Sequence, residues 1–128
     1  MILIITPDKE KAKSLKNMAQ TTIKRLKETN TSKYPSNTLK DYYDIIHELM
    51  EAISLTKGIK FKGDGAHQEL IEYIVKEYDF SEQERILLQQ IRDYRNRISY
   101  EGFMINENFI ISNDKKIQEI IDKLSNLI

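Results

Sequence analysis

Apolar residues recur at intervals of three and four positions in five separate segments of the chain, which is the spacing of one buried helix face. Only four glycines and two prolines occur among the 128 residues, so long irregular stretches are not expected. This length allows one helical core but not two. The sequence therefore predicts a single all-α domain over residues 1–128, an up-and-down bundle of four to five helices with short links. The clearest buried stripe is expected at Leu39, Tyr43, Ile46, Met50 and Ile53.

Capping residues set the expected limits of the first three helices. The first helix is predicted over 8–30, and the second over 36–57 with Gly58 as its C-terminal cap. After a glycine-containing loop at 59–65, Asp64 is the expected N-cap of the third helix. The apolar positions expected in the core are Leu15, Met18, Ile23 and Leu26 in the first helix, and Leu70, Ile71, Ile74, Val75 and Tyr78 in the third.

Ser81 and Glu84 match the serine-x-x-glutamate pattern of a capping box, so a fourth helix is predicted to begin there and to end at Gly102. The segment 103–111 alternates in part between apolar and polar residues, and it fits an extended chain, a loop or a short strand pair. A final helix is expected from about Asn113. The core positions expected in these two helices are Leu87, Ile91, Tyr94 and Ile98, then Ile117, Ile120, Ile121, Leu124 and Leu127.

The absence of cysteine excludes disulfide frameworks, thiolate zinc sites and cysteine nucleophiles, and it suits a reducing, cytoplasmic location. The apolar run at 1–5 is too short for a signal-peptide core or a membrane span, so no membrane partner is expected. The chain has no P-loop, no dinucleotide-binding glycine pattern, no nucleophilic-serine elbow and no cluster of metal ligands. The sequence therefore predicts neither a cofactor nor a metal.

Charge is unevenly distributed along the chain, although 20 basic and 20 acidic residues give a formal net charge of zero. The basic residues concentrate in the first predicted helix and the acidic residues in the second and third. A basic first helix can attract phosphate backbones, but the same lysines also fit a simple solvated face. These lysines are Lys9, Lys11, Lys13, Lys16, Lys24 and Lys27.

The predicted fourth helix carries three closely spaced arginines, Arg92, Arg95 and Arg97. At about 100° per residue, Arg95, Asn96 and Tyr100 fall on one polar flank of this helix. Arg97 falls across the helix beside Asp93, where a surface ion pair is expected. A guanidinium, a carboxamide and a phenol on one flank suit the recognition of a phosphate and of a stacked base. An arginine-rich helix can equally form a network of ion pairs, and the spacing alone leaves both interpretations open.

The segment 95–100 resembles the HEPN motif, in which an arginine is followed by Asn, Asp or His, then by three residues and a histidine. Arg95 and Asn96 match the first two positions, and Tyr100 stands where the histidine usually is. The surrounding pattern is also similar, with Lys57-Gly58-Ile59-Lys60 at the end of the second helix and Ala66-His67 at the start of the third. The likeness is to a short archaeal-type subgroup in which Tyr-x-Gly follows the arginine–asparagine pair, and it covers roughly residues 8–127.

This resemblance implies a four- to five-helix bundle that forms a homodimer, with the motif helices of two subunits lining a shared positive cleft. It also implies a metal-independent RNA endonuclease, the toxin of a toxin–antitoxin pair whose partner is a minimal nucleotidyltransferase. Arg95, Asn96 and Tyr100 would then be the catalytic residues, and Arg92 and Arg97 would bind RNA. In such enzymes the 2′-hydroxyl attacks the adjacent phosphate and leaves a cyclic phosphate.

Tyr100 departs from the motif in a way that matters for catalysis. The ordinary pKa of tyrosine is about 10 against about 6.5 for histidine, and a general base works best when its pKa is near the operating pH. A non-catalytic domain that binds RNA, a nucleotide or a nucleotidyltransferase is therefore the alternative. His47 and His67 each stand alone in their segments, so structural roles are expected for both, and an approach of either to Tyr100 in a folded dimer stays open.

Overall fold

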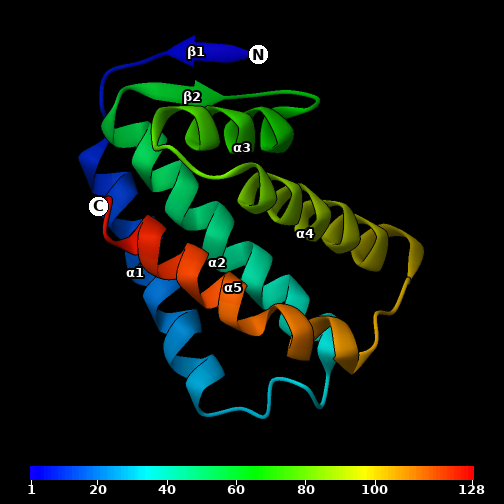
Figure 1. Ribbon diagram of the computed structural model, residues 1–128. Helices are drawn as coiled ribbons and strands as arrows, with labels where there is room; N and C mark the ends of the chain where they lie inside the picture. Colours follow the sequence, from blue (N-terminus) through cyan, green and yellow to red (C-terminus); the bar gives the residue numbers. More distant parts are fainter.

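Two long antiparallel helices form the centre of the molecule. A computed structural model describes residues 1–128. Helix α1 (Lys9–Lys27) lies against α2 (Pro35–Thr56), and the two are joined by a short turn (Figure 1). Helix α2 contacts every other helix of the chain, and the whole predicted stripe from Leu39 to Ile53 is buried. The sequence placed this helix well because its apolar stripe is long and unbroken.

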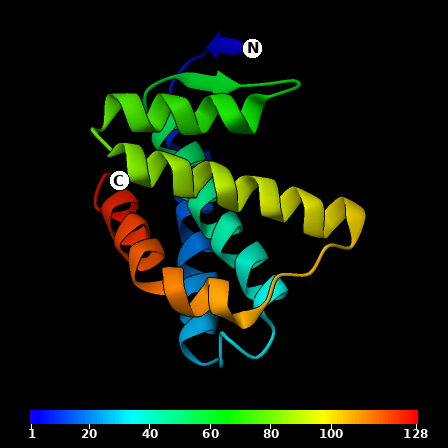
Figure 2. The same cartoon turned by 45° about the vertical axis from the view of Figure 1, so that its right-hand side comes forward.

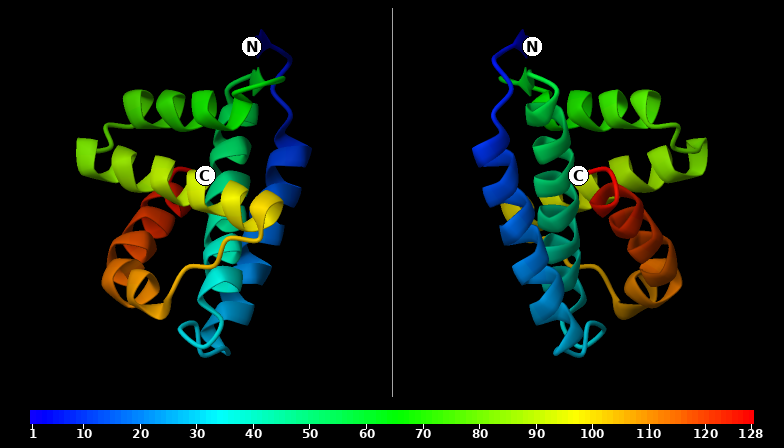
Figure 3. Two further views of the ribbon diagram at one scale, coloured as in Figure 1. Left: turned by 90° about the vertical axis from the view of Figure 1, so that its right-hand side faces the viewer. Right: turned by 90° about the vertical axis from the view of Figure 1, so that its left-hand side faces the viewer.

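Helices α3 (Ala66–Glu77) and α4 (Glu82–Glu101) form a hairpin that lies across the α1–α2 pair (Figures 2 and 3). The predicted capping box is confirmed: Ser81 Oγ accepts from the Glu84 amide at 3.1 Å, and Glu84 Oε1 accepts from the Ser81 amide at 2.8 Å. Gly102 ends α4, as predicted, and it adopts the left-handed conformation. The hairpin therefore presents the C-terminal half of α4 beside the start of α3.

Helix α5 (Glu107–Ser125) packs on α2 and begins earlier than the predicted Asn113. Asn106 caps it, with its side-chain oxygen accepting from the Asn108 amide at 2.8 Å. Residues 103–106 are the link from α4, so most of the ambiguous segment 103–111 is helical. The prediction was late because the mixed polar and apolar residues after the cap hid the start of the periodicity.

A small antiparallel sheet joins the N-terminus to the link between α2 and α3. Strand β1 (Ile2–Ile4) pairs with β2 (Ile59–Phe61), so part of the predicted loop at 59–65 is a strand. The expected N-cap Asp64 is wrong: Gly65 caps α3 with a φ of 77°. Such a left-handed conformation favours glycine, which has no Cβ to clash with the backbone.

The all-α fold class is confirmed, and most buried apolar side chains form one connected core. The prediction that Met18 and Leu127 lie in the core is wrong, because Met18 is 51% exposed and Leu127 is 39% exposed. Small residues of α1 face α2 instead, since Ala12 and Ala19 allow the two backbones to approach closely. None of the helices combines the length and apolar character that crossing a bilayer requires.

Candidate functional site

An open groove separates the C-terminal half of α4 from the N-terminal turn of α3. We call it the arginine groove; α3 and the loop before it contribute residues 63–68. Helix α4 contributes Arg92, Arg95, Asn96 and Tyr100. Four of the five residues that the sequence singled out on α4 therefore share one cavity, because the helix persists through residue 101 and keeps them on one flank.

The two arginines of the groove carry charges that no acidic side chain neutralises directly. Neither Arg92 nor Arg95 forms a salt bridge, whereas Arg85 on the same helix pairs with Glu72 and Glu82. Arg92 Nε donates to Gln89 at 2.8 Å, and Arg95 Nη1 donates to Asn96 at 3.3 Å. Within the chain, Arg92 and Arg95 therefore do not belong to the network of ion pairs that the spacing also allowed.

Arg95 lies against the ring of Tyr43 on α2. Its guanidinium carbon lies 5.6 Å from the centre of the Tyr43 ring, and its Nε is buried without a hydrogen-bond partner. Burial raises the pKa of the Asp44 carboxyl, and the nearby positive charge of Arg95 opposes that rise. Arg95 is thus partly desolvated, which strengthens its attraction for an anion.

The first turn of α3 adds backbone donors to the groove. No side chain caps this helix, and the backbone N–H groups of His67 and Gln68 have no acceptor in the protein. Free N–H groups and the positive end of the helix dipole both favour a negative group at such a position. Hydrogen-bond donors therefore belong to residues of both helices that line the groove, His67 and Gln68 of α3 and Arg92 and Arg95 of α4.

His67 extends from this same turn and contacts two residues of α2. Its Nδ1 lies 2.7 Å from the hydroxyl oxygen of Tyr43, and its ring centre lies 4.1 Å from that of His47. Burial is the main cause that lowers the pKa of His67, and the nearby charges of His47 and Arg95 lower it further. His67 is therefore neutral at pH 7. The sequence missed this pair because His47 and His67 lie on different helices with no motif spacing.

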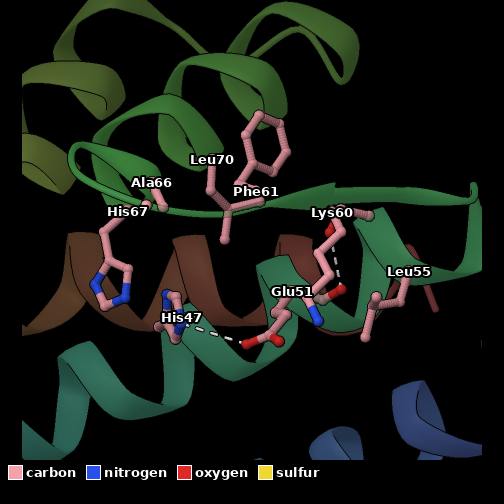
Figure 4. Close-up of a pocket in the computed structure, with 10 residues that line it drawn as sticks. His47, Glu51, Leu55, Lys60, Phe61, Ala66, His67 and Leu70 are labelled. Carbon is pink, nitrogen blue, oxygen red and sulfur yellow. Dashed lines mark hydrogen bonds and ion pairs between the residues drawn. The ribbon is translucent and has the colours of Figure 1, made fainter. Parts of the chain in front are cut away.

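A second cavity of about 290 Å³ lies on the other side of His67, between α2, β2 and the start of α3 (Figure 4). We call it the histidine pocket. Gly63, Ala66 and His67 line both this pocket and the arginine groove, so the two cavities adjoin. The remaining lining residues of the histidine pocket are His47, Glu51, Ser54, Leu55, Lys60, Phe61 and Leu70.

Glu51 is the acidic group of the histidine pocket. Its carboxylate lies 3.4 Å from Nε2 of His47 and 3.7 Å from Nζ of Lys11. A hydrogen bond from His47 and the positive charges of Lys11 and Lys60 lower the pKa of Glu51, against the effect of burial. Glu51 is therefore ionised at neutral pH.

The remaining predicted site residues are more exposed. Tyr100 is 78% exposed, at the rim of the arginine groove. Arg97 lies outside the groove, with its guanidinium carbon 4.0 Å from the centre of the Phe103 ring. The expected ion pair of Arg97 with Asp93 is wrong, because the side chain extends toward the end of α4 and pairs with Glu101 at 3.8 Å.

No three side chains of histidine, aspartate or glutamate converge closely enough to hold a metal ion. Comparison of the chain with protein-family models, with curated proteins and with solved structures gave no significant match. The chemistry of the site therefore rests on the geometry of the arginine groove and the histidine pocket.

Proposed function

We propose that this chain is a HEPN-type RNA-binding protein that holds a phosphodiester in the arginine groove and cleaves RNA without a metal ion. The observation that carries the proposal is the convergence of two unpaired arginines, Arg92 and Arg95, on the uncapped N-terminus of α3. The likeness of residues 95–100 to the HEPN motif supports RNA as the source of that phosphodiester.

The groove suits a phosphodiester better than an isolated surface arginine would. The guanidinium of Arg95 stays charged at any relevant pH and can donate to two phosphate oxygens at once. Asn96 accepts a hydrogen bond from Nη1 of Arg95 at 3.3 Å and can also donate to a phosphate oxygen. Tyr100 at the rim offers an exposed ring on which a base can stack.

Cleavage would proceed by attack of the 2′-oxygen on the neighbouring phosphorus. A new bond from the 2′-oxygen to phosphorus forms as the bond to the 5′-oxygen breaks, which gives a 2′,3′-cyclic phosphate and a free 5′-hydroxyl. The proton lost by the 2′-hydroxyl is balanced by the proton gained at the 5′-oxygen, so no water or metal is consumed. Arg92 and Arg95 would stabilise the charge that develops on the phosphate oxygens.

The test is cleavage of single-stranded RNA in the presence of a chelator, with wild-type protein and Arg95→Ala. We expect cleavage by the wild type and a loss of about 10²-fold or more in the variant, the usual effect of losing one transition-state donor. Arg85→Ala is the matched control, since Arg85 lies on the same helix but outside the groove. Equal cleavage by wild type and Arg95→Ala, or by neither, would remove the enzymatic claim.

The alternative is a non-catalytic domain that binds RNA, a nucleotide or a nucleotidyltransferase, and the contact of His67 with Tyr43 favours it. Burial raises the pKa of Tyr43 to about 12, so its hydroxyl stays protonated. This hydroxyl has no other hydrogen-bond partner than His67 Nδ1. If it donates there, neutral His67 carries its own proton on Nε2 and can donate to a phosphate but cannot accept a proton from a 2′-hydroxyl.

Two measurements separate binding from catalysis. The ¹⁵N chemical shifts of His67 report which ring nitrogen carries the proton, and protonated Nδ1 would favour catalysis. The substitution Tyr100→His restores the motif histidine, so nuclease activity that appears only in this variant would favour the non-catalytic alternative.

The resemblance also supports a role as the toxin of a toxin–antitoxin pair, a homodimeric assembly and a minimal nucleotidyltransferase as partner. A shared cleft requires a dimer, because a two-fold interface between two subunits is what places their motif helices face to face. Light scattering at micromolar concentration tests this part of the proposal. A monomer would exclude a composite site and leave the groove of a single chain to act alone.

A further inference from the structure

The histidine pocket adjoins the arginine groove at His67, and this adjacency bears on which nucleotide the protein selects. Gly63, Ala66 and His67 form the shared boundary of the two cavities. A phosphate held by Arg92 and Arg95 would therefore lie next to the histidine pocket. The base of the same nucleotide is the group that can enter it, since bases of single-stranded RNA can be turned outward.

The walls of the histidine pocket suit a flat heterocycle. The rings of His47 and His67, whose centres lie 4.1 Å apart, form one wall, and Leu70 and the backbone of β2 at Phe61 lie above them (Figure 4). Histidine rings are among the surfaces on which proteins stack unpaired bases, whereas the ring of Phe61 packs on Tyr73 of α3. The pocket volume of about 290 Å³ lies just below the range for ligand pockets, roughly 300–1,000 Å³. The pocket thus suits one base better than a larger ligand.

The polar groups of the pocket define which base fits. Glu51 presents a carboxylate that accepts hydrogen bonds only, and Lys60 presents an ammonium that donates only. Figure 4 shows the side chain of Lys60 reaching toward Glu51, so acceptor and donor stand at the same part of the pocket. The contacts of Glu51 with His47 and Lys11, at 3.4 and 3.7 Å, are long and leave the carboxylate able to accept further bonds.

We infer that the histidine pocket is a guanine-binding site, in which Glu51 accepts from N1–H and from the exocyclic amino group of the base while Lys60 donates to O6. Guanine alone offers two adjacent donors beside one acceptor on its Watson–Crick edge. Adenine and cytosine would turn a ring-nitrogen lone pair toward the carboxylate, and uracil offers only one N–H. This inference rests on the proposed function, since the arginine groove holds the phosphate of the same nucleotide.

The wild-type protein provides the first test. Calorimetric titration with the 5′-monophosphates of guanosine, adenosine, cytidine and uridine, and with ribose 5-phosphate, separates the base from the phosphate. We expect guanosine monophosphate to bind about tenfold or more tightly than the other three nucleotides, as one good bidentate contact to a base provides. Equal affinity for all four nucleotides would overturn the inference without any substitution.

The substitution Glu51→Gln tests the assigned contact. Glutamine keeps the shape but replaces one acceptor oxygen by a donor, so we expect the preference for guanosine monophosphate to fall about tenfold. Binding of ribose 5-phosphate should stay unchanged. Glu48→Gln is the matched control, because Glu48 lies one turn away on α2 and lines neither cavity. A guanine preference that persists in Glu51→Gln would overturn the inference.

Failure of the inference is distinguishable from failure of the proposed function. Arg95→Ala should weaken ribose 5-phosphate and all four nucleotides by the same factor, because Arg95 contacts only the phosphate. If Arg95→Ala has this effect while the bases bind equally, the groove function stands and the guanine site is wrong. If Arg95→Ala leaves ribose 5-phosphate binding unchanged, the proposed function is wrong. The guanine inference, which rests on that function, is then wrong as well.

Discussion

The hydroxyl oxygen of Tyr43 lies 2.7 Å from Nδ1 of His67, and this contact ties the central helix α2 to the first turn of α3. His67 forms the boundary between the arginine groove and the histidine pocket, so the contact fixes the side chain that both cavities share. The guanidinium carbon of Arg95 lies over the same tyrosine, 5.6 Å from the centre of the Tyr43 ring. One buried tyrosine thus positions a cation and an imidazole.

Tyr43→Phe should lower the free energy of unfolding by about 1 kcal/mol. The substitution keeps the ring beside Arg95 but removes the hydroxyl, which leaves the partly buried Nδ1 of His67 without a partner. Urea unfolding followed by circular dichroism measures the change. Tyr34→Phe is the control, since Tyr34 is 60% exposed and its hydroxyl makes no hydrogen bond, and it should alter stability by much less. Equal effects of the two substitutions would contradict the assigned contact.

The protein should lose stability as the pH falls below about 6.5, because the folded state resists protonation of His67. Burial and neighbouring positive charge lower the pKa of His67 from its usual value of 6.5. In the window between the two pKa values, the unfolded chain binds the proton more readily, so acid favours unfolding. The stabilisation from neutral His67 is complete above the pKa that His67 has in the unfolded chain. It is lost as the pH falls through the lower pKa that His67 has in the folded protein.

Unfolding curves of wild type and His67→Asn between pH 7 and pH 5 measure this contribution. The stability of the variant should depend less steeply on pH across that window. Glu51 contributes at lower pH, because its pKa is lowered from 4.5 and its stabilisation disappears only as the pH falls below that value. Identical slopes for wild type and His67→Asn would show that His67 does not resist protonation.

Gly58→Ala should destabilise the protein more than Gly102→Ala does. Both glycines have positive φ values, 73° and 67°, so alanine is strained at either position by about 1–2 kcal/mol. At Gly58 an added Cβ would also lie 2.6 Å from the carbonyl oxygen of Ile5, whereas at Gly102 it would meet nothing within 4 Å. The difference in thermal unfolding between the two variants measures the cost of this clash. Equal losses of stability in the two variants would contradict the prediction.

The binding of RNA should depend less on salt when Arg92 is removed. A side chain that contacts a phosphate releases counterions, so the slope of log K against log salt for single strands changes by about 0.7 per contact. Fluorescence anisotropy of labelled single-stranded RNA, titrated at several salt concentrations, measures this slope for Arg92→Ala. The control Arg85→Ala should keep the wild-type slope, since Arg85 is already paired with Glu72 and Glu82. A wild-type slope in Arg92→Ala would mean that Arg92 touches no phosphate.

The sequence anticipated those parts of the fold that depend on local interactions. The unbroken stripe of α2 and the capping box at Ser81 predicted their elements correctly, because helix periodicity and capping involve residues close together in the chain. It also placed Arg95, Asn96 and Tyr100 on one flank of α4, for the same reason. The cap of α3 was mistaken because a positive φ at Gly65 outweighed the capping preference of Asp64.

Local patterns could not show which surfaces meet when the helices pack. His47 and His67 each stand alone in the sequence, yet their ring centres lie 4.1 Å apart because the α3–α4 hairpin crosses α2. The same crossing brings the start of α3 opposite Arg95 and opens the pocket beside Glu51 and Lys60. The sequence alone thus determined the helices and the arginine flank, through interactions within one helical turn. Only the tertiary structure decided what faces that flank, because contacts between distant segments depend on how whole helices pack together.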